Sequence, residues 1–240
     1  MRGKGRGPVR RRSRISLRSV RAMGISLLLA STSARAADRP AAFVDAAQVV
    51  SGLVVEMRYA GGHNFVGTPI DGYERPLCLL TRQAAQALSE VERDLRARGL
   101  GLKVYDCYRP VRAVANFVRW ARDLRDVKRK AEFYPTVNKR DLFRLGYIAV
   151  QSGHSRGATV DLGLVTLADG RDLDMGTPFD TFGPRSWPGD TAVSVDARAN
   201  RVLLAAAMRR RGFRPYVREW WHFTLRGEPF PGTYFDFPVR

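Results

Sequence analysis

The stretch SGHSRGATVDLGLV, residues 152–165, combines a turn, a strand and two side chains able to bind a metal ion. Apolar side chains alternate with small or polar ones from 158 to 165, which predicts a strand with Asp161 on one face. Gly157 tolerates the positive φ of a tight turn, so the chain can bend just before this strand. His154 and Asp161 are seven positions apart, and an odd spacing places side chains on opposite faces of a straight strand. We therefore expect His154 on the turn and Asp161 on the strand that follows.

A second segment, EWWH at residues 219–222, supplies another imidazole and another carboxylate. The chain has only three histidines, and two of them, His154 and His222, fall in these two segments. Two histidines and one aspartate form a ligand set for catalytic zinc, which keeps its fourth position for water. The sequence thus predicts one Zn²⁺ per chain held by His154, Asp161 and His222. Glu219 is then free to act as the general base. For each histidine alone, the alternative is a hydrogen-bonded structural residue.

The aromatic and threonine residues at 220–225 predict a further strand. His222 shares a face of this strand with Trp220 and Thr224. Glu219 lies at the strand entrance, three positions from His222, so the two face one cavity only if the strand is twisted or bulged. Without such an irregularity, Glu219 is a surface carboxylate paired with a nearby arginine.

Periodicity and turn residues predict further helices and strands around these segments. The expected elements are strands at 53–57 and 102–107, a helix at 81–98 capped by Thr81 and stopped by Gly99, a helix that begins at Pro110 with an apolar face ending at Leu124, and a helix capped by Asp196 that runs through Arg211. Residues 166–195 form a Gly/Pro/Asp-rich excursion longer than loops usually run without a function. Helices and strands intermix without regular βαβ alternation. We expect one α+β domain, a small antiparallel sheet flanked by helices, with the zinc site in a cleft on the sheet.

The N-terminal 36 residues have the pattern of a secretory signal peptide. A basic stretch ends at Arg21, an apolar run covers 22–34, and Ala34-Arg35-Ala36 offers a small-x-small cleavage site. The apolar run is too short to span a bilayer about 30 Å thick as a helix. We expect an exported, periplasmic protein with a mature domain at 37–240 and no stable membrane anchor. The alternative is a disordered basic tail that binds anionic surfaces.

The net charge of +18 is concentrated at this N-terminus. Residues 1–36 hold ten basic residues and no acidic one, which leaves 31 basic and 23 acidic residues in the rest of the chain. In that part of the chain basic and acidic residues are interspersed and do not form long runs of one charge, so we expect no nucleic-acid partner. Nothing in the sequence specifies the oligomeric state.

Two cysteines, Cys78 and Cys107, are too few for a structural zinc cage. In an oxidising compartment we expect one disulfide between them. The alternative is two buried reduced thiols, because the geometry of the two side chains decides whether they can be bridged.

Arg109 stands in DCYRP, residues 106–110, where a predicted strand passes into a predicted helix. Its planar, permanently charged guanidinium could stabilise an oxyanion or bind a substrate carboxylate. The alternative is an ordinary ion pair. No Gly-rich phosphate loop and no Gly-x-Ser-x-Gly elbow is present in the sequence to support another mechanism.

These motifs resemble those of the D-alanyl-D-alanine dipeptidase family, the zinc peptidases of the vancomycin-resistance type. The resemblance rests on SGHSRG at 152–157 with Asp161, EWWH at 219–222, YRP at 108–110 and LDMGTPFD at 173–180, and it extends over most of residues 50–240, including Gly72-Tyr73 and YFDFP at 234–238. It implies zinc binding by His154, Asp161 and His222. It also implies that Glu219 is the general acid/base and Arg109 the transition-state stabiliser. The predicted export signal departs from the best-known resistance enzymes.

The resemblance further implies that Ser152 and Asp180 hold the ends of a small dipeptide substrate. The expected function is zinc-dependent hydrolysis of D-alanyl-D-alanine to two D-alanines in cell-wall peptide turnover. One alternative is a zinc D,D-carboxypeptidase that acts on peptidoglycan stem peptides. Another, of a different class, is a non-catalytic basic module that binds the cell wall. The sequence leaves open whether the role is D-Ala scavenging, wall remodelling or glycopeptide resistance.

Overall fold

The central element of the fold is the strand that carries Asp161. The structure, a computed structural model, describes residues 38–240, so the predicted signal peptide at 1–36 lies outside the described residues. The main sheet has five strands in the order β2-β4-β5-β7-β6, namely β2 (Val54–Val55), β4 (Leu100–Asp106), β5 (Thr159–Thr166), β7 (Glu219–Leu225) and β6 (Phe213–Tyr216). Only the short edge pair β2–β4 is parallel; β4–β5, β5–β7 and β6–β7 are antiparallel. A second, two-stranded sheet pairs β1 (Phe43–Asp45) with β3 (Leu79–Thr81).

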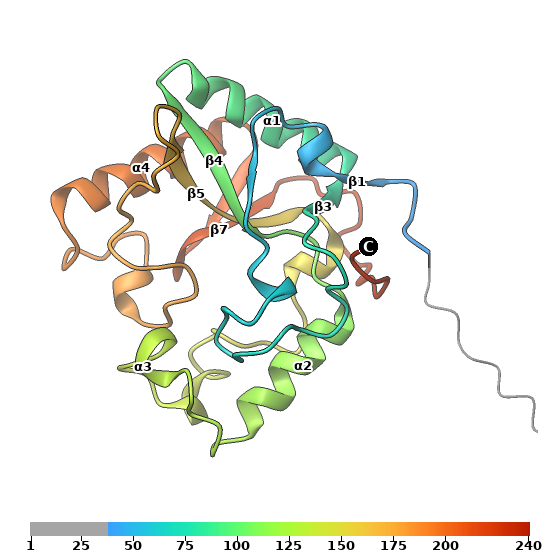
Figure 1. Cartoon of the computed structure of the whole chain (residues 1–240), viewed down its shortest axis with the longest axis vertical. Coiled ribbons are helices and arrows are strands. Elements are labelled where there is room, and N and C mark those ends of the chain that lie inside the picture. Colours follow the sequence, from blue (N-terminus) through green and yellow to red (C-terminus); the bar gives the residue numbers. More distant parts are fainter. Residues whose placement is uncertain (1–37) are drawn as a thin grey trace, which may run out of the picture. The chain divides into compact units, whose positions relative to one another are not determined.

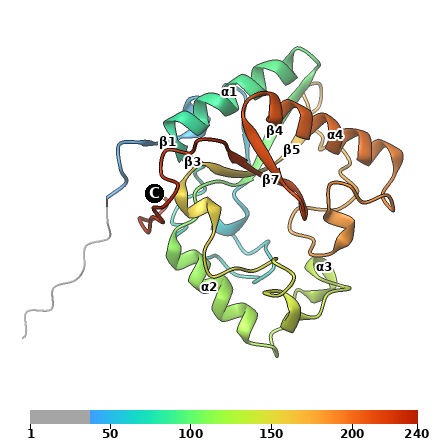
Figure 2. The same ribbon diagram turned by 180° about the vertical axis from the view of Figure 1, so that it is seen from behind.

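Some helices cover one face of this sheet, and others lie beyond its end (Figure 1). The helices are α1 (Arg82–Arg96), α2 (Val111–Arg122), α3 (Lys130–Phe133) and α4 (Val195–Arg210), with short 3-10 turns η1 (Ala46–Gln48), η2 (Arg58–Ala60), η3 (Lys139–Asp141), η4 (Gly153–Arg156) and η5 (Pro184–Ser186). Helices α1 and α4 pack against each other and against β4 and β6, and they lie in front of the sheet in Figure 2. The prediction of a single α+β domain is confirmed. No helix within residues 38–240 is long and apolar enough to cross a membrane.

Strand β5 forms where the alternating pattern predicted a strand, and it is buried on both faces. Seven of its eight residues are buried. The reason is the long excursion after β5, whose Phe179 packs against Tyr105 of β4 and Trp221 of β7. The excursion therefore covers the sheet face opposite α1 and α4.

The helix boundaries follow the predicted capping residues with one error. Thr81 caps α1 by accepting a hydrogen bond from the backbone N–H of Ala84. The prediction that Asp196 caps the third helix is wrong, because Ser194 Oγ accepts the hydrogen bond from Ala197 N at 3.0 Å. Asp196 instead lies in the first turn of α4, where a carboxylate interacts favourably with the helix dipole. Leu124 lies beyond the end of α2 and is half exposed.

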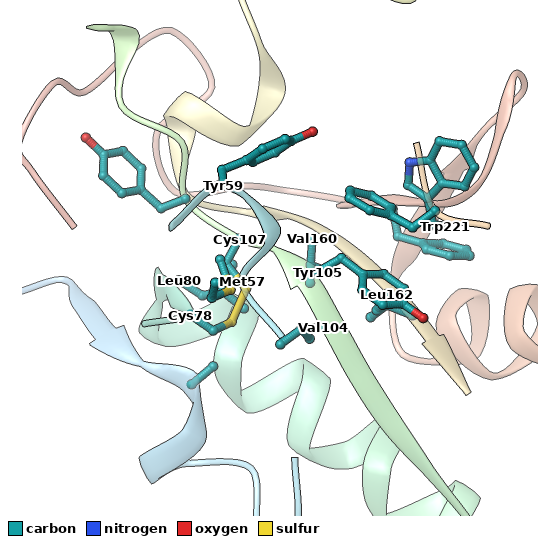
Figure 3. Packing of buried hydrophobic residues seen from close by; sticks show 14 of the residues in the cluster. Met57, Tyr59, Cys78, Leu80, Val104, Tyr105, Cys107, Val160, Leu162 and Trp221 are labelled. Carbon is teal, nitrogen blue, oxygen red and sulfur yellow. A yellow bond between two sulfur atoms is a disulfide. The ribbon is translucent and has the colours of Figure 1, made fainter. Parts of the chain in front are cut away.

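The two cysteines form a disulfide, which confirms one of the two alternatives. Cys78 and Cys107 have Cα atoms 5.2 Å apart, and their sulfur atoms are bonded inside the hydrophobic core (Figure 3). Cys78 directly precedes β3, and Cys107 directly follows β4. The bond thus joins the two-stranded sheet to the five-stranded sheet.

Replacing Cys78 and Cys107 together by alanine should lower the free energy of unfolding by about 3–4 kcal/mol, since the cross-link closes a loop between residues 29 apart in sequence. Guanidinium unfolding of both proteins measures the difference. Wild-type protein denatured without reductant should also show no free thiol. Two titratable thiols would contradict the disulfide.

Candidate metal and active site

Three side chains that could bind a metal ion come from separate elements and converge at one end of β5. His154 comes from η4, Asp161 from β5, and His222 from β7, directly opposite Asp161 in the β5–β7 register. Their donor atoms lie within 4.8 Å of one another. His154 Nε2 is 3.3 Å from Asp161 Oδ2 and 3.3 Å from His222 Nδ1, and Asp161 Oδ1 is 3.0 Å from His222 Nδ1. The predicted ligand residues are therefore within coordinating reach of a single ion.

The donor set fits a zinc ion. Ligand atoms about 2.0–2.2 Å from a tetrahedral zinc ion lie about 3.3–3.6 Å from one another, close to the observed separations. Asp161 Oδ1 is buried and accepts no hydrogen bond, although buried carboxylate oxygens are normally paired. Burial works to raise the pKa of Asp161, but the neighbouring His154 and His222 more than offset it, so the net pKa is lowered. Asp161 is thus ionised, as a metal ligand must be.

His154 is oriented by hydrogen bonds on its side away from the cluster. Its Nδ1–H donates to the backbone carbonyl of Cys107 at 2.7 Å, which leaves the Nε2 lone pair free for a metal. Ser152 Oγ accepts a hydrogen bond from the backbone N–H of His154. Gly157 ends the turn at φ +79°, as expected, and a Cβ there would overlap the ring of Phe43. Ser152 thus holds the start of the turn, and Gly157 with Phe43 defines its end.

An irregularity in β7 turns Glu219 toward the same cluster. Pro215 pairs with Phe223 but Tyr216 with Glu219, so the register of β6 and β7 shifts at this point. Glu219 Oε2 consequently lies 3.5 Å from His222 Nδ1. Within residues 38–240 no arginine pairs with Glu219, contrary to the surface-carboxylate alternative. Burial, together with the negative charge of Asp161, raises the pKa of Glu219 to about 8.

Arg109 approaches the cluster from the end of β4. Its Nε and Nη2 donate to Asp106 Oδ2 at 2.9 and 2.7 Å, and Nη2 lies 3.8 Å from Asp161 Oδ2. Asp106 is fully buried and also accepts a hydrogen bond from Tyr73 at 2.5 Å. Arg109 is therefore in an ion pair, as the alternative interpretation predicted, but its partner Asp106 is buried and the guanidinium lines the site.

Asp180, from the long excursion, faces the cluster from the side of η2. Tyr59 in η2 donates a hydrogen bond from its hydroxyl to Asp180 Oδ2 at 2.8 Å. Asp180 is the one non-glycine residue with positive φ in the part of the chain that the structure describes, at 61°. Burial and the charge of Asp161 raise its pKa well above the usual range. A strained backbone beside a buried carboxyl is typical of functional positions.

All the predicted site residues line one cavity of about 260 Å³. These are Arg109, Ser152, His154, Asp161, Asp180, Glu219 and His222. The third histidine, His63, lies apart, exposed between Arg58 and Glu132. Sequence reasoning missed Tyr59 and Asp106 as members of the site. Asp106 stood in the quoted segment DCYRP, yet its burial beside Arg109 has no signature in the sequence.

Comparison with known proteins identifies relatives along most of the chain. A family model described as D-ala-D-ala dipeptidase (Peptidase_M15) matches residues 39–240. A D-alanyl-D-alanine dipeptidase of Streptomyces coelicolor is 42% identical over 198 residues, which cover 82% of this chain and 97% of the relative. D-alanyl-D-alanine dipeptidases of Enterococcus faecium and Enterococcus faecalis are 38% and 40% identical, over 80% of this chain and 96% and 95% of those proteins.

Proposed function

The chain belongs to the D-ala-D-ala dipeptidase family of peptidases, and from this premise we propose that it is a zinc-dependent enzyme that hydrolyses D-alanyl-D-alanine to two D-alanines. One observation carries the proposal. The His154, Asp161 and His222 cluster shares a cavity with the partly buried carboxyl of Glu219 and the partly buried guanidinium of Arg109, each 13% exposed. Metal-assisted hydrolysis requires such an arrangement of ligands, general base and cationic group.

Glu219 is the proton carrier of the proposed reaction. When bound, zinc activates a water molecule by lowering its pKa toward about 7 and polarises the scissile carbonyl. Glu219 accepts the proton of the attacking water and then donates it to the leaving amine. Its Oε2 lies 3.5 Å from Nδ1 of His222, which places the carboxyl group beside the proposed metal ligands, where the attacking water would bind.

Arg109 stabilises the oxyanion of the tetrahedral intermediate. The two hydrogen bonds to Asp106 hold the guanidinium in one orientation before substrate arrives. Preorganised cations in a dry site need no rearrangement when the negative charge develops.

Replacing Arg109 by alanine should lower kcat about 10²- to 10³-fold, since loss of one oxyanion contact costs about 2.7–4 kcal/mol. Steady-state kinetics on D-Ala-D-Ala measure the change, and metal analysis of the same preparation should show unchanged zinc. A normal kcat in the zinc-loaded variant would remove Arg109 from the reaction.

Asp180 and Ser152 bind the two charged ends of the substrate. A carboxyl oxygen of Asp180 can accept a hydrogen bond from the ammonium, and the hydroxyl of Ser152 can donate one to the carboxylate. Both side chains line the same cavity, and Asp180 is only 5% exposed. A longer peptide would leave the buried carboxyl of Asp180 or the half-buried hydroxyl of Ser152 unpaired, which is unfavourable. This supports a dipeptide rather than a longer peptide as substrate.

Replacing Asp180 by asparagine should reduce kcat/KM for D-Ala-D-Ala about 10- to 150-fold, mainly through KM, because a hydrogen bond to a charged group contributes about 1.5–3 kcal/mol. A substrate analogue without the ammonium group should lose this dependence on Asp180. Equal losses with both substrates would assign Asp180 a structural role instead.

Residues 1–36 are proposed as a signal peptide that directs the enzyme to the periplasm. An exported enzyme does not meet cytoplasmic wall precursors, so we favour the scavenging of dipeptide released during cell-wall turnover. Mass spectrometry of the exported protein tests cleavage after Ala36. A deletion strain should lose growth on D-Ala-D-Ala as its source of D-alanine, and unchanged growth would count against this role.

The function itself is tested by comparing substrates with the processed protein. Release of D-alanine from free D-Ala-D-Ala, with much slower release from a stem pentapeptide, is the expected result. The reverse preference would favour the D,D-carboxypeptidase alternative. Absence of metal and of hydrolysis, with cell-wall binding that falls steeply with salt, would favour the non-catalytic module.

A further inference from the structure

The Cys78–Cys107 disulfide lies at the junction between the two sheets and the site. Strand β3, which follows Cys78, pairs only with β1 and has no ladder to the main sheet. Next to the cross-link, the backbone N–H of Tyr108 donates a hydrogen bond to the carbonyl of Leu79 at 2.8 Å. Both cysteines are fully buried in the core, so neither contacts solvent (Figure 3). The disulfide therefore fixes the end of β4 against β3.

The residues that follow β4 position two parts of the site at once. The carbonyl of Cys107 accepts the hydrogen bond from His154 Nδ1 at 2.7 Å. Two residues on, the backbone N–H of Arg109 donates to the carbonyl of His154 at 3.3 Å. The carboxylate of Asp106 holds the guanidinium of Arg109. A shift of Cys107 would consequently move the partner of His154 and the start of the segment that carries Arg109.

Strand β3 contacts the same turn from its other end. The backbone N–H of Thr81 donates to the carbonyl of Gly157 at 2.8 Å. Gly157 is the left-handed residue that ends the turn carrying His154. The turn thus lies between β3 and the segment after β4, and the disulfide joins these two neighbours covalently.

We propose that the Cys78–Cys107 disulfide is a positioning element of the metal site, which fixes the carbonyl that orients His154. The inference rests on the zinc site of the proposed function. Partners that orient a ligand histidine typically account for 10- to 100-fold in metal affinity or activity when they are lost. A cross-link that served only stability would lower the unfolding temperature and leave the zinc affinity of the folded protein unchanged.

The test compares zinc affinity in two variants of similar stability. One replaces Cys78 and Cys107 together by alanine. The matched control is Leu95→Ala, which removes a buried side chain in the last turn of α1. That turn lies beside the start of β4, whereas the site lies beyond the end of that strand. Competition with a chromogenic chelator gives the zinc dissociation constant, and thermal unfolding gives the stability of each protein.

The expected result is a zinc dissociation constant raised at least about tenfold in the double cysteine variant, with a lower kcat for the zinc-saturated protein. Leu95→Ala should lose stability while its zinc affinity stays within twofold of wild type. Equal zinc affinity in wild type and the folded double variant would overturn the inference. If the double alanine variant does not fold, a second variant combines Cys78→Val with Cys107→Ala, so that the valine fills part of the lost volume. We expect the same rise in the zinc dissociation constant for this variant. Wild-type protein that binds no zinc would overturn the proposed function instead, so the two failures are distinguishable.

Discussion

Replacing Glu219 by glutamine should lower kcat for D-Ala-D-Ala by two to four orders of magnitude, the usual contribution of a general acid–base residue. Glutamine keeps the volume of the side chain and fits the same position beside His222, but its amide neither accepts the proton of water nor delivers one to the leaving amine. Because the proposed zinc ligands are three other residues, the variant should keep its full zinc content.

Both quantities are measured on one preparation, kcat by D-alanine release and zinc by elemental analysis. The combination matters, since loss of activity together with loss of zinc would assign Glu219 to the ligand set rather than to proton transfer. A kcat near that of wild type in a fully loaded variant would exclude Glu219 from the mechanism.

Replacing His222 by alanine should abolish stoichiometric zinc binding and, with it, activity. Only two protein ligands, His154 and Asp161, would remain, one fewer than catalytic zinc sites use. The substitution also removes the imidazole whose Nδ1 lies 3.0 Å from Oδ1 of the buried Asp161, so that this oxygen loses its nearest polar neighbour. We therefore expect some loss of stability as well.

The chain offers a matched control in its remaining histidine. His63 is exposed and lies between Arg58 and Glu132, away from the cavity. His63→Ala should keep zinc and activity at wild-type levels. A full metal complement in His222→Ala would contradict the ligand assignment. Equal losses of zinc and activity in His222→Ala and His63→Ala would show that the losses come from a general disturbance of the protein and not from a missing ligand.

Part of the candidate metal site could be anticipated from the sequence, because the determinants of that part are local. His154 and Asp161 belong to one turn and the strand after it, and the glycine that permits the turn is visible in the sequence. The place of His222 depends on the pairing of β5 with β7, which brings it opposite Asp161 from 61 residues away. The sequence indicated that Glu219 could face the cluster only if the strand were irregular, but it did not show which irregularity. The register shift depends on the pairing of β6 with β7, which is a tertiary contact.

Tyr59 and Asp106 join the site through tertiary contacts, and they escaped prediction for that reason. Asp106 is three residues from Arg109, a spacing that on a surface would form an ordinary ion pair. Its importance comes from complete burial and from the hydroxyl of Tyr73, neither of which has a local signature. Similarly, Ser194 and Asp196 are both residue types that often cap helices. Because α4 begins at Val195, Ser194 takes the capping position.

The central claim is that His154, Asp161 and His222 bind one zinc ion, and metal analysis with X-ray absorption spectroscopy of the processed protein tests it most directly. We expect about one zinc per chain with nitrogen and oxygen ligands and an imidazole signal that is lost in His222→Ala. Protein that carries no metal and gains neither zinc nor D-alanine release when zinc is added would contradict it.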